Sequence, residues 1–179
     1  SDGGYVIHKD SIHLTKKIIT CGLSDDWKFE KNFTQLNKNC SIIAYDHTVD
    51  KDFWYQRFKK DLIHFFLLKK LRWKKIIKIF DYIDYRKFFD NKNKHYLKKV
   101  VKNSIKENEI SLHEILQNVN EIILKIDVEG SEYDILSDIT KNSKKIISLI
   151  IEFHDIKRNL DKIENFIIEN KLLKLIHIH

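Results

Sequence analysis

The sequence predicts an α/β fold with a mostly parallel, twisted sheet flanked by helices. Short apolar runs alternate along the chain with segments whose apolar residues recur at helical spacing, as in βαβ units. The apolar runs are nearly continuous, which is typical of strands that are buried on both faces. With 179 residues, 42% of them hydrophobic and none of them proline, the whole chain, 1–179, is expected to form a single domain.

The expected elements follow one another in a regular order. The first strand, 17–21, has the sequence K-I-I-T-C and ends before Gly22, and the second, 41–45, ends before Asp46. Apolar runs at 122–128 and 146–153 predict two further strands, and 172–178 predicts a last one. Helices are expected at 29–37, at 132–141 and at 160–170, where Ile163, Phe166 and Ile167 recur at helical spacing.

A basic and aromatic insertion at 53–89 separates the second strand from the third. Nine lysines or arginines and a single acid, Asp61, lie between Arg57 and Lys78. Apolar residues at helical intervals predict one or two amphipathic helices. These helices are expected to pack on the sheet, to form a lid over a substrate pocket, or to place a basic face, 57–80, on an anionic membrane. A nucleic-acid surface is not expected, because no binding motif accompanies the charge.

The composition limits the compartment and the class of partner. Cys21 and Cys40 are too few for a disulfide framework and too far apart along neighbouring parallel strands for a bridge. Both are therefore expected as free thiols of a cytoplasmic protein. No apolar run reaches the length of a membrane span. The net charge of +7 is only modest evidence for an anionic partner, because a solvated basic surface explains it equally well.

The most informative segment is 124–136, where an apolar strand runs into acidic residues, one glycine and a helix. Asp127, Glu129 and Glu132 follow the strand, and the ligands of open α/β sheets bind outside the carboxyl ends of strands. Gly130 allows the chain to turn sharply there. These carboxylates are therefore candidates for chemistry, although Glu132 is expected mainly to interact with the dipole of the helix that it begins.

Gly22 and Asp46 end the first two strands and lie 24 positions apart. This spacing is close to that between a nucleotide-binding turn and its ribose-binding acid. However, the loop after Gly22 lacks the G-x-G-x-x-G pattern and carries Asp25 and Asp26, which would repel a phosphate. A nucleoside ligand without phosphates is therefore favoured, and S-adenosylmethionine is the clearest example. The alternative for Asp46 is a turn or a helix cap.

Five segments, taken in order, resemble a known family. They are 2–6 (D-G-G-Y-V), 22–30 (G-L-S-D-D-W-K-F-E), 44–49 (A-Y-D-H-T-V), 124–136 (L-K-I-D-V-E-G-S-E-Y-D-I-L) and 151–155 (I-E-F-H-D). Together they resemble the FkbM-type S-adenosylmethionine-dependent methyltransferases over nearly the whole chain. The resemblance implies a Rossmann-like methyltransferase fold and methyl transfer to a hydroxyl of a sugar or glycan precursor, as in polysaccharide biosynthesis. It also implies a further C-terminal strand, which is expected to be missing from this chain.

The same resemblance implies roles for individual residues. Gly22 would line the methionine side of S-adenosylmethionine, Asp46 would hold its ribose, and Asp127 would lie beside its reactive centre. Methyl transfer requires an aligned oxygen nucleophile and the removal of its proton. Asp127, Glu129 and His154 are therefore the candidate catalytic residues.

Two alternatives remain open from the sequence. A divalent metal could bind Asp127, Glu129, His154 and Asp155, but no strict ligand spacing demands it and no metal is predicted. The chain could also be a catalytically inactive module that binds a membrane or a partner through the insertion. The favoured hypothesis is a cytoplasmic enzyme, and contact with the inner face of the membrane through 57–80 is left open, as is oligomerisation.

Overall fold

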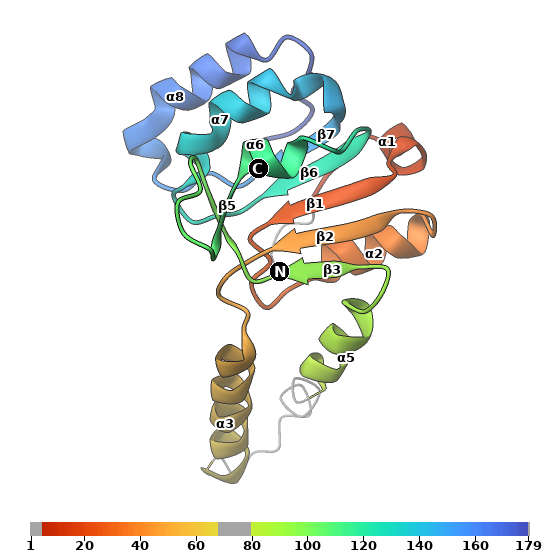
Figure 1. The fold of residues 1–179 in the computed structure, drawn as a ribbon, viewed down its shortest axis with the longest axis vertical. Coiled ribbons are helices and arrows are strands. Elements are labelled where there is room, and N and C mark those ends of the chain that lie inside the picture. Colours follow the sequence, from red (N-terminus) through yellow and green to blue (C-terminus); the bar gives the residue numbers. More distant parts are fainter. Residues whose placement is uncertain (1–4, 68–79, 179) are drawn as a thin grey trace.

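The main sheet has five strands in the order β3-β2-β1-β6-β7, and every neighbouring pair is parallel. The computed structural model describes residues 5–67 and 80–178 (Figure 1). Its main strands are β1 (Lys17–Cys21), β2 (Ser41–Tyr45), β3 (Lys94–Tyr96), β6 (Ile122–Ile126) and β7 (Ile146–Ile151). Two short parallel strands, β4 (Lys99–Val101) and β5 (Glu109–Ser111), form a separate ladder. The predicted α/β architecture with a mostly parallel sheet is confirmed.

Helices follow the strands and cover both faces of the sheet. They are α1 (Lys9–Leu14), α2 (Lys28–Leu36), α3 (Lys51–Leu67), α5 (Asp81–Phe88), α6 (Leu112–Leu116), α7 (Glu132–Lys141), the 3-10 helix η1 (Ser143–Lys145) and α8 (Ile156–Glu169). The short α6 begins with a capping box, in which the Ser111 hydroxyl accepts a hydrogen bond from the Glu114 amide and the Glu114 carboxylate accepts one from the Ser111 amide. The bounds of α7 agree with those predicted for 132–141.

Two apolar clusters lie on opposite faces of the sheet, because successive side chains of a strand point to opposite sides. In β6, Ile122, Leu124 and Ile126 join the cluster that includes residues of α6, α7 and α8. Ile123 joins the other cluster, with residues of β1, β2 and α2. Lys125 shares the face of Ile123 and meets Glu30 of α2 there. The near-continuous apolar run of β6 is thus explained by burial on both faces.

Strands β6 and β7 end two residues earlier than the sequence predicts, at Ile126 and Ile151. Asp127 and Glu152 therefore stand at strand exits instead of within strands. The strand predicted at 172–178 is wrong, because the backbone from 170 to 178 forms turns and irregular structure. Most of its apolar side chains are exposed, and no described strand pairs with this segment. Without such a partner its backbone groups cannot form a ladder.

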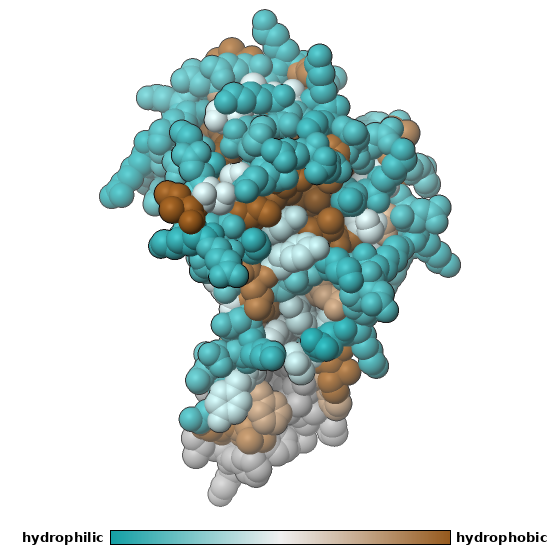
Figure 2. Space-filling view, in the orientation of Figure 1, coloured by the Kyte–Doolittle hydropathy of each residue, from teal (hydrophilic) through white to brown (hydrophobic). Residues whose placement is uncertain are grey.

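The helical character predicted for the insertion is confirmed by α3 and α5, which project beyond the β3 edge in Figure 1. Residues 68–79, and with them much of the predicted basic face, lie outside the described residues. Trp54 of α3 and Tyr85 of α5 pack in an aromatic cluster with Trp27, whose ring centroid is 6.0 Å from that of Trp54. Figure 2 shows hydrophilic and apolar residues side by side on the projecting part. The lid that the sequence suggests for this insertion stays a prediction.

Cys21 and Cys40 are free, as predicted, and both are buried. Within 5–67 and 80–178, no helix combines the length and apolar character needed to cross a membrane.

Candidate functional site

The strand order reverses between β1 and β6, and the loops after these two strands form the centre of the candidate site. In open α/β sheets, ligands bind at such a switch point, outside the carboxyl ends of the strands. Gly22 follows β1, and its amide donates to the Tyr45 carbonyl at 2.9 Å. Asp127 follows β6, and its amide donates to the Cys21 carbonyl at 2.8 Å. The ladder therefore continues one residue past the strands and holds both exits in register.

Gly22 lies directly against the backbone of Asp127. Its φ is +84°, and a Cβ placed on it would lie 1.7 Å from the Asp127 carbonyl oxygen. No side chain fits in that space, and residues other than glycine rarely adopt this backbone conformation. Glycine is thus required here by the close approach of two strand exits, which the sequence could not show.

Asp46, at the exit of β2, is buried and binds the loop that follows β1. One carboxylate oxygen accepts hydrogen bonds from the amides of Leu23 and Ser24, each at 2.8 Å. The other accepts from the amide of Thr48 at 2.7 Å and from its hydroxyl at 2.6 Å. Burial alone would raise the pKa of Asp46, but these hydrogen bonds outweigh it and lower the pKa below its usual value.

Four donors match the roughly four lone-pair sites of a carboxylate. In this arrangement Asp46 fixes the loop after Gly22, so its observed contacts are those of a turn-forming residue. The predicted contact with a ribose stays a prediction, and it requires one of these hydrogen bonds to be shared or exchanged.

Asp127, Glu152 and His154 form a compact group at the neighbouring exits of β6 and β7. One potential ligand atom from each lies within 4.8 Å of those of the other two. The Nε2 of His154 is 3.9 Å from Oδ1 of Asp127. Burial and the Glu152 carboxylate raise the pKa of Asp127, because both disfavour its charged form. The structure thus brings together two of the predicted catalytic residues and adds Glu152.

Glu132 orients His154 from the start of α7. Its side chain is fully buried, and Oε1 lies 2.5 Å from His154 Nδ1. This hydrogen bond raises the pKa of His154, since it stabilises the imidazolium form. The Tyr133 hydroxyl donates to the His154 backbone carbonyl and ties the same loop to α7. Glu132 therefore has a partner in the site besides the helix dipole.

Glu129, the remaining predicted catalytic residue, is exposed and lies outside this group. Its φ of +48° and the +99° of Gly130 turn the chain between β6 and α7. Within the part of the chain that the structure describes, its side chain makes no hydrogen bond or ion pair, although its charge contributes to the raised pKa of Asp127. Glu152 was missed because 146–153 was predicted as one strand. The signal was present, since Glu152 is the first charged residue after the apolar run of β7.

A buried ion pair supports the site from the other face of the sheet. Lys125 of β6, 4% exposed, donates to Glu30 of α2 over 3.3 Å, and Thr20 of β1 donates to the same oxygen over 2.8 Å. Burial would lower the pKa of Lys125, but the Glu30 carboxylate outweighs it and raises the pKa. The Tyr5 ring covers the ammonium at 5.0 Å. Lys125 is therefore a charged residue two positions before Asp127, on a strand that is otherwise apolar.

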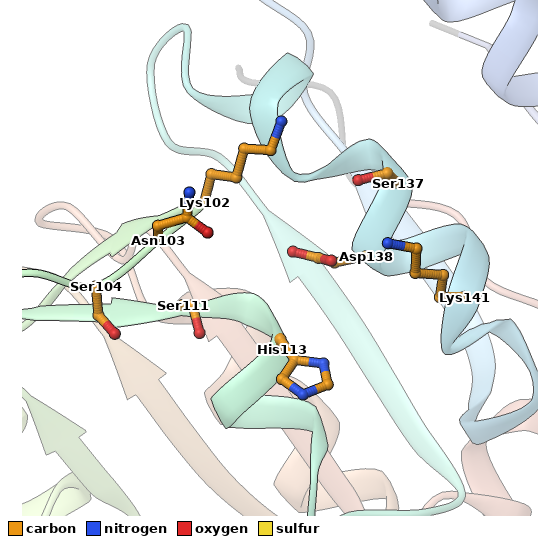
Figure 3. A pocket seen from close by; sticks show the side chains of 8 residues that line it. All are labelled: Lys102, Asn103, Ser104, Ser111, His113, Ser137, Asp138 and Lys141. Carbon is orange, nitrogen blue, oxygen red and sulfur yellow. The ribbon is translucent and has the colours of Figure 1, made fainter.

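One hollow of the described surface adjoins the site, and another lies away from it. A hollow of about 570 Å³ is lined by residues 153–158, so His154 opens into it. Another, of about 450 Å³, lies between the loop that follows β4, the junction of β5 with α6, and α7 (Figure 3). Its lining is polar and basic, with Lys102, His113 and Lys141 among its residues, and it includes none of the predicted site residues. The hollow beside His154 is therefore a candidate place for a substrate at the exit of β7.

The fold and the site define a class of protein. The parallel sheet reverses its strand order between β1 and β6, and a glycine and acidic residues stand at these central exits. Such an arrangement is typical of Rossmann-like proteins that bind a nucleotide or nucleoside cofactor. A family model described as the methyltransferase FkbM domain matches residues 72–173, which is more than half of the chain. The chain therefore belongs to the FkbM methyltransferase family.

The matched range includes Asp127, Glu152 and His154, whereas Gly22 and Asp46 precede it. The exits of β6 and β7 thus fall within the part of the chain that shows the family. Neither the curated proteins nor the solved structures include a match to this chain.

Proposed function

We propose that this methyltransferase uses S-adenosylmethionine and transfers its methyl group to a hydroxyl of a sugar or glycan precursor. The observation that carries the proposal is the close approach of Gly22 to Asp127 at the switch point of the sheet, within a chain that belongs to a methyltransferase family. This contact holds the two central strand exits side by side, and the ligands of open α/β sheets bind outside such exits. Asp127 supplies a negative charge that would attract the sulfonium.

The group at the β6 and β7 exits would handle the acceptor. The hydroxyl oxygen must lie in line with the methyl group and lose its proton, and carboxylates and imidazole can promote that loss. His154 is one of the residues that line the hollow of about 570 Å³, which would provide space for an acceptor beside the imidazole. In the transfer, the new O–C bond forms as the C–S bond breaks, and the products are the methyl ether, S-adenosylhomocysteine and a proton.

Calorimetric titration with S-adenosylmethionine and S-adenosylhomocysteine tests the cofactor. We expect the wild-type chain to bind both and Asp127→Asn to bind S-adenosylmethionine more weakly, because the variant removes the charge beside the sulfonium. Asp161→Asn, which removes one charge from exposed α8, is the matched control and should bind normally. Asp46→Ala should abolish binding, either by loss of the ribose contact or by release of the loop that Asp46 holds.

The acceptor is tested by mass spectrometry of reactions with a panel of sugars and glycan precursors. A product heavier by one methylene that is stable to mild base indicates an ether, whereas a base-labile product indicates methyl transfer to a carboxylate. A folded wild-type chain that binds neither cofactor form would overturn the proposal.

A second candidate, a catalytically inactive module that binds membranes, is favoured by one observation. On α3, Tyr55, Phe58, Leu62 and Ile63 are exposed, and Lys59 and Lys60 lie beside them. Arg57 does not contribute a free charge, since it pairs with Asp25 and Asp81. Cofactor binding distinguishes the two candidates, because an inactive module need not retain the pocket.

A further inference from the structure

We propose that Asp127, Glu152 and His154 bind a divalent cation at the adjoining exits of β6 and β7. The proposal concerns the metal alone and does not depend on the cofactor or the acceptor. The ligands considered from the sequence included Glu129 and Asp155, which are exposed. The fold instead brings Glu152 together with Asp127 and His154.

The ligand atoms of the three side chains lie close enough together to bind one cation. The three side chains offer two carboxylates and an imidazole whose ligand atoms lie within 4.8 Å of one another. Ligand atoms at about 2.1 Å from a cation lie about 3–4 Å apart, so only small side-chain rotations are needed. The 3.9 Å between His154 Nε2 and Asp127 Oδ1 is already in that range and is longer than a hydrogen bond.

Glu132 provides an independent indication. It is fully buried, and its Oε1 engages Nδ1 of His154, which directs Nε2 towards Asp127. Histidines that bind metals commonly donate their other ring nitrogen to a carboxylate in this way, and the carboxylate fixes the tautomer and the orientation of the ring. The other oxygen of Glu132 is buried without a hydrogen-bond partner. A buried carboxylate with one unsatisfied oxygen is costly unless strong positive charge lies nearby.

Lys125, the buried lysine of β6, is paired with another carboxylate. Lys125 directs its ammonium to Glu30 on the opposite face of the sheet, with a hydrogen bond of 3.3 Å. Three carboxylates, those of Asp127, Glu132 and Glu152, therefore surround one imidazole. A divalent cation would balance this excess of negative charge.

The set of donors indicates the class of cation. Two carboxylates and one imidazole suit Mn²⁺ and Mg²⁺ in six-fold coordination, and Zn²⁺ with an open position. Three protein ligands leave coordination positions free for water or a substrate. If the proposed function holds, an acceptor hydroxyl bound there would lose its proton more readily, because the cation stabilises the alkoxide.

Titration of the full chain with Mn²⁺ alone, followed by the loss of the free-ion electron paramagnetic resonance signal, tests the site. We expect one saturable site per chain. Glu152→Gln removes one exposed ligand and should weaken binding at least about tenfold. Asp155→Asn removes one exposed carboxylate three residues away and should leave the affinity unchanged.

Glu132→Gln keeps all three ligands and tests the orienting role. It should weaken Mn²⁺ binding about 10–100-fold while the chain stays folded by circular dichroism. Absence of saturable binding by the wild type would overturn the proposal. Equal affinities of wild type and Glu152→Gln, or equal weakening by Asp155→Asn, would overturn it as well, because binding would then be nonspecific attraction to surface charge.

Discussion

Gly22→Ala tests whether the candidate site depends on the close approach of the β1 and β6 exits. The new Cβ would lie 1.7 Å from the Asp127 carbonyl oxygen, whereas real contacts of this kind essentially never fall below 3.0 Å. The two segments must therefore separate by about 1.3 Å, which is the difference between these distances. The backbone hydrogen bonds of 2.8–2.9 Å on either side of this point resist such a shift.

The cost has two parts. Holding alanine at a φ of +84° costs about 1–2 kcal/mol, and forcing extra volume into a packed site typically costs about 1–3 kcal/mol more. Gly22→Ala should therefore lower the free energy of unfolding by about 2–5 kcal/mol and should displace Asp127. Gly130→Ala is a matched control, since its φ is +99° but nothing lies within 4 Å of the added Cβ. It should cost only the backbone part, about 1–2 kcal/mol.

Urea unfolding measures both free energies, and calorimetry measures S-adenosylhomocysteine binding by each folded variant. We expect Gly22→Ala to lose more stability than Gly130→Ala and to lose cofactor binding. Equal destabilisation of the two variants, or normal cofactor binding by Gly22→Ala, would refute the reasoning, because the contact with Asp127 would then be unimportant.

Three further predictions concern groups around the site. The pKa of Asp46 is lower in the folded chain than its unfolded value of about 3.9. The ionised Asp46 carboxylate therefore stabilises the folded chain above about pH 3.9, and this stabilisation is lost as the pH falls through the folded pKa. Asp46→Asn should therefore destabilise the chain at pH 7 by about 2–3 kcal/mol, and the difference from wild type in urea unfolding should shrink towards pH 2. Lys125→Met should lower the free energy of unfolding by about 3–5 kcal/mol, because it leaves the Glu30 carboxylate buried without its cation. Adding Glu30→Gln should restore much of that stability, and a double variant as unstable as Lys125→Met alone would contradict this explanation. If α3 contacts membranes, Phe58→Ser with Leu62→Ser should reduce cosedimentation with anionic vesicles, whereas unchanged cosedimentation would exclude this face.

Much of the site could be located from the sequence, because the signals are local. A glycine or a polar residue directly after an apolar run marks a strand exit, and this signal found Gly22 and Asp46. Asp127 was found because acidic residues interrupt the apolar run of β6, although the strand end was placed two residues too late. The same rule would have found Glu152 if the end of β7 had been placed at Ile151. Strand ends are hard to place because flanking apolar residues continue the pattern after the ladder stops, as Phe153 does here.

Other parts of the fold could not be predicted, because their signals are too short or depend on partners. Strands β3, β4 and β5 have three residues each, which is too few to show a period. The segment 172–178 has a strand-like pattern, but it has no hydrogen-bonding partner among the described strands. Lys125 within an apolar strand is explained only by Glu30, which is far away in sequence but lies across the packed interface with α2.

The sequence by itself determined the alternation of strands and helices, the parallel sheet and the position of the acidic strand exits, because hydrophobic periodicity and strand ends are encoded in neighbouring residues. Only the tertiary structure decided which exits adjoin and what their side chains do there. It placed Gly22 against Asp127, grouped Asp127 with Glu152 and His154, and left Glu129 in solvent. These arrangements depend on strand order and on the packing of helices from distant parts of the chain, and no local pattern contains that information.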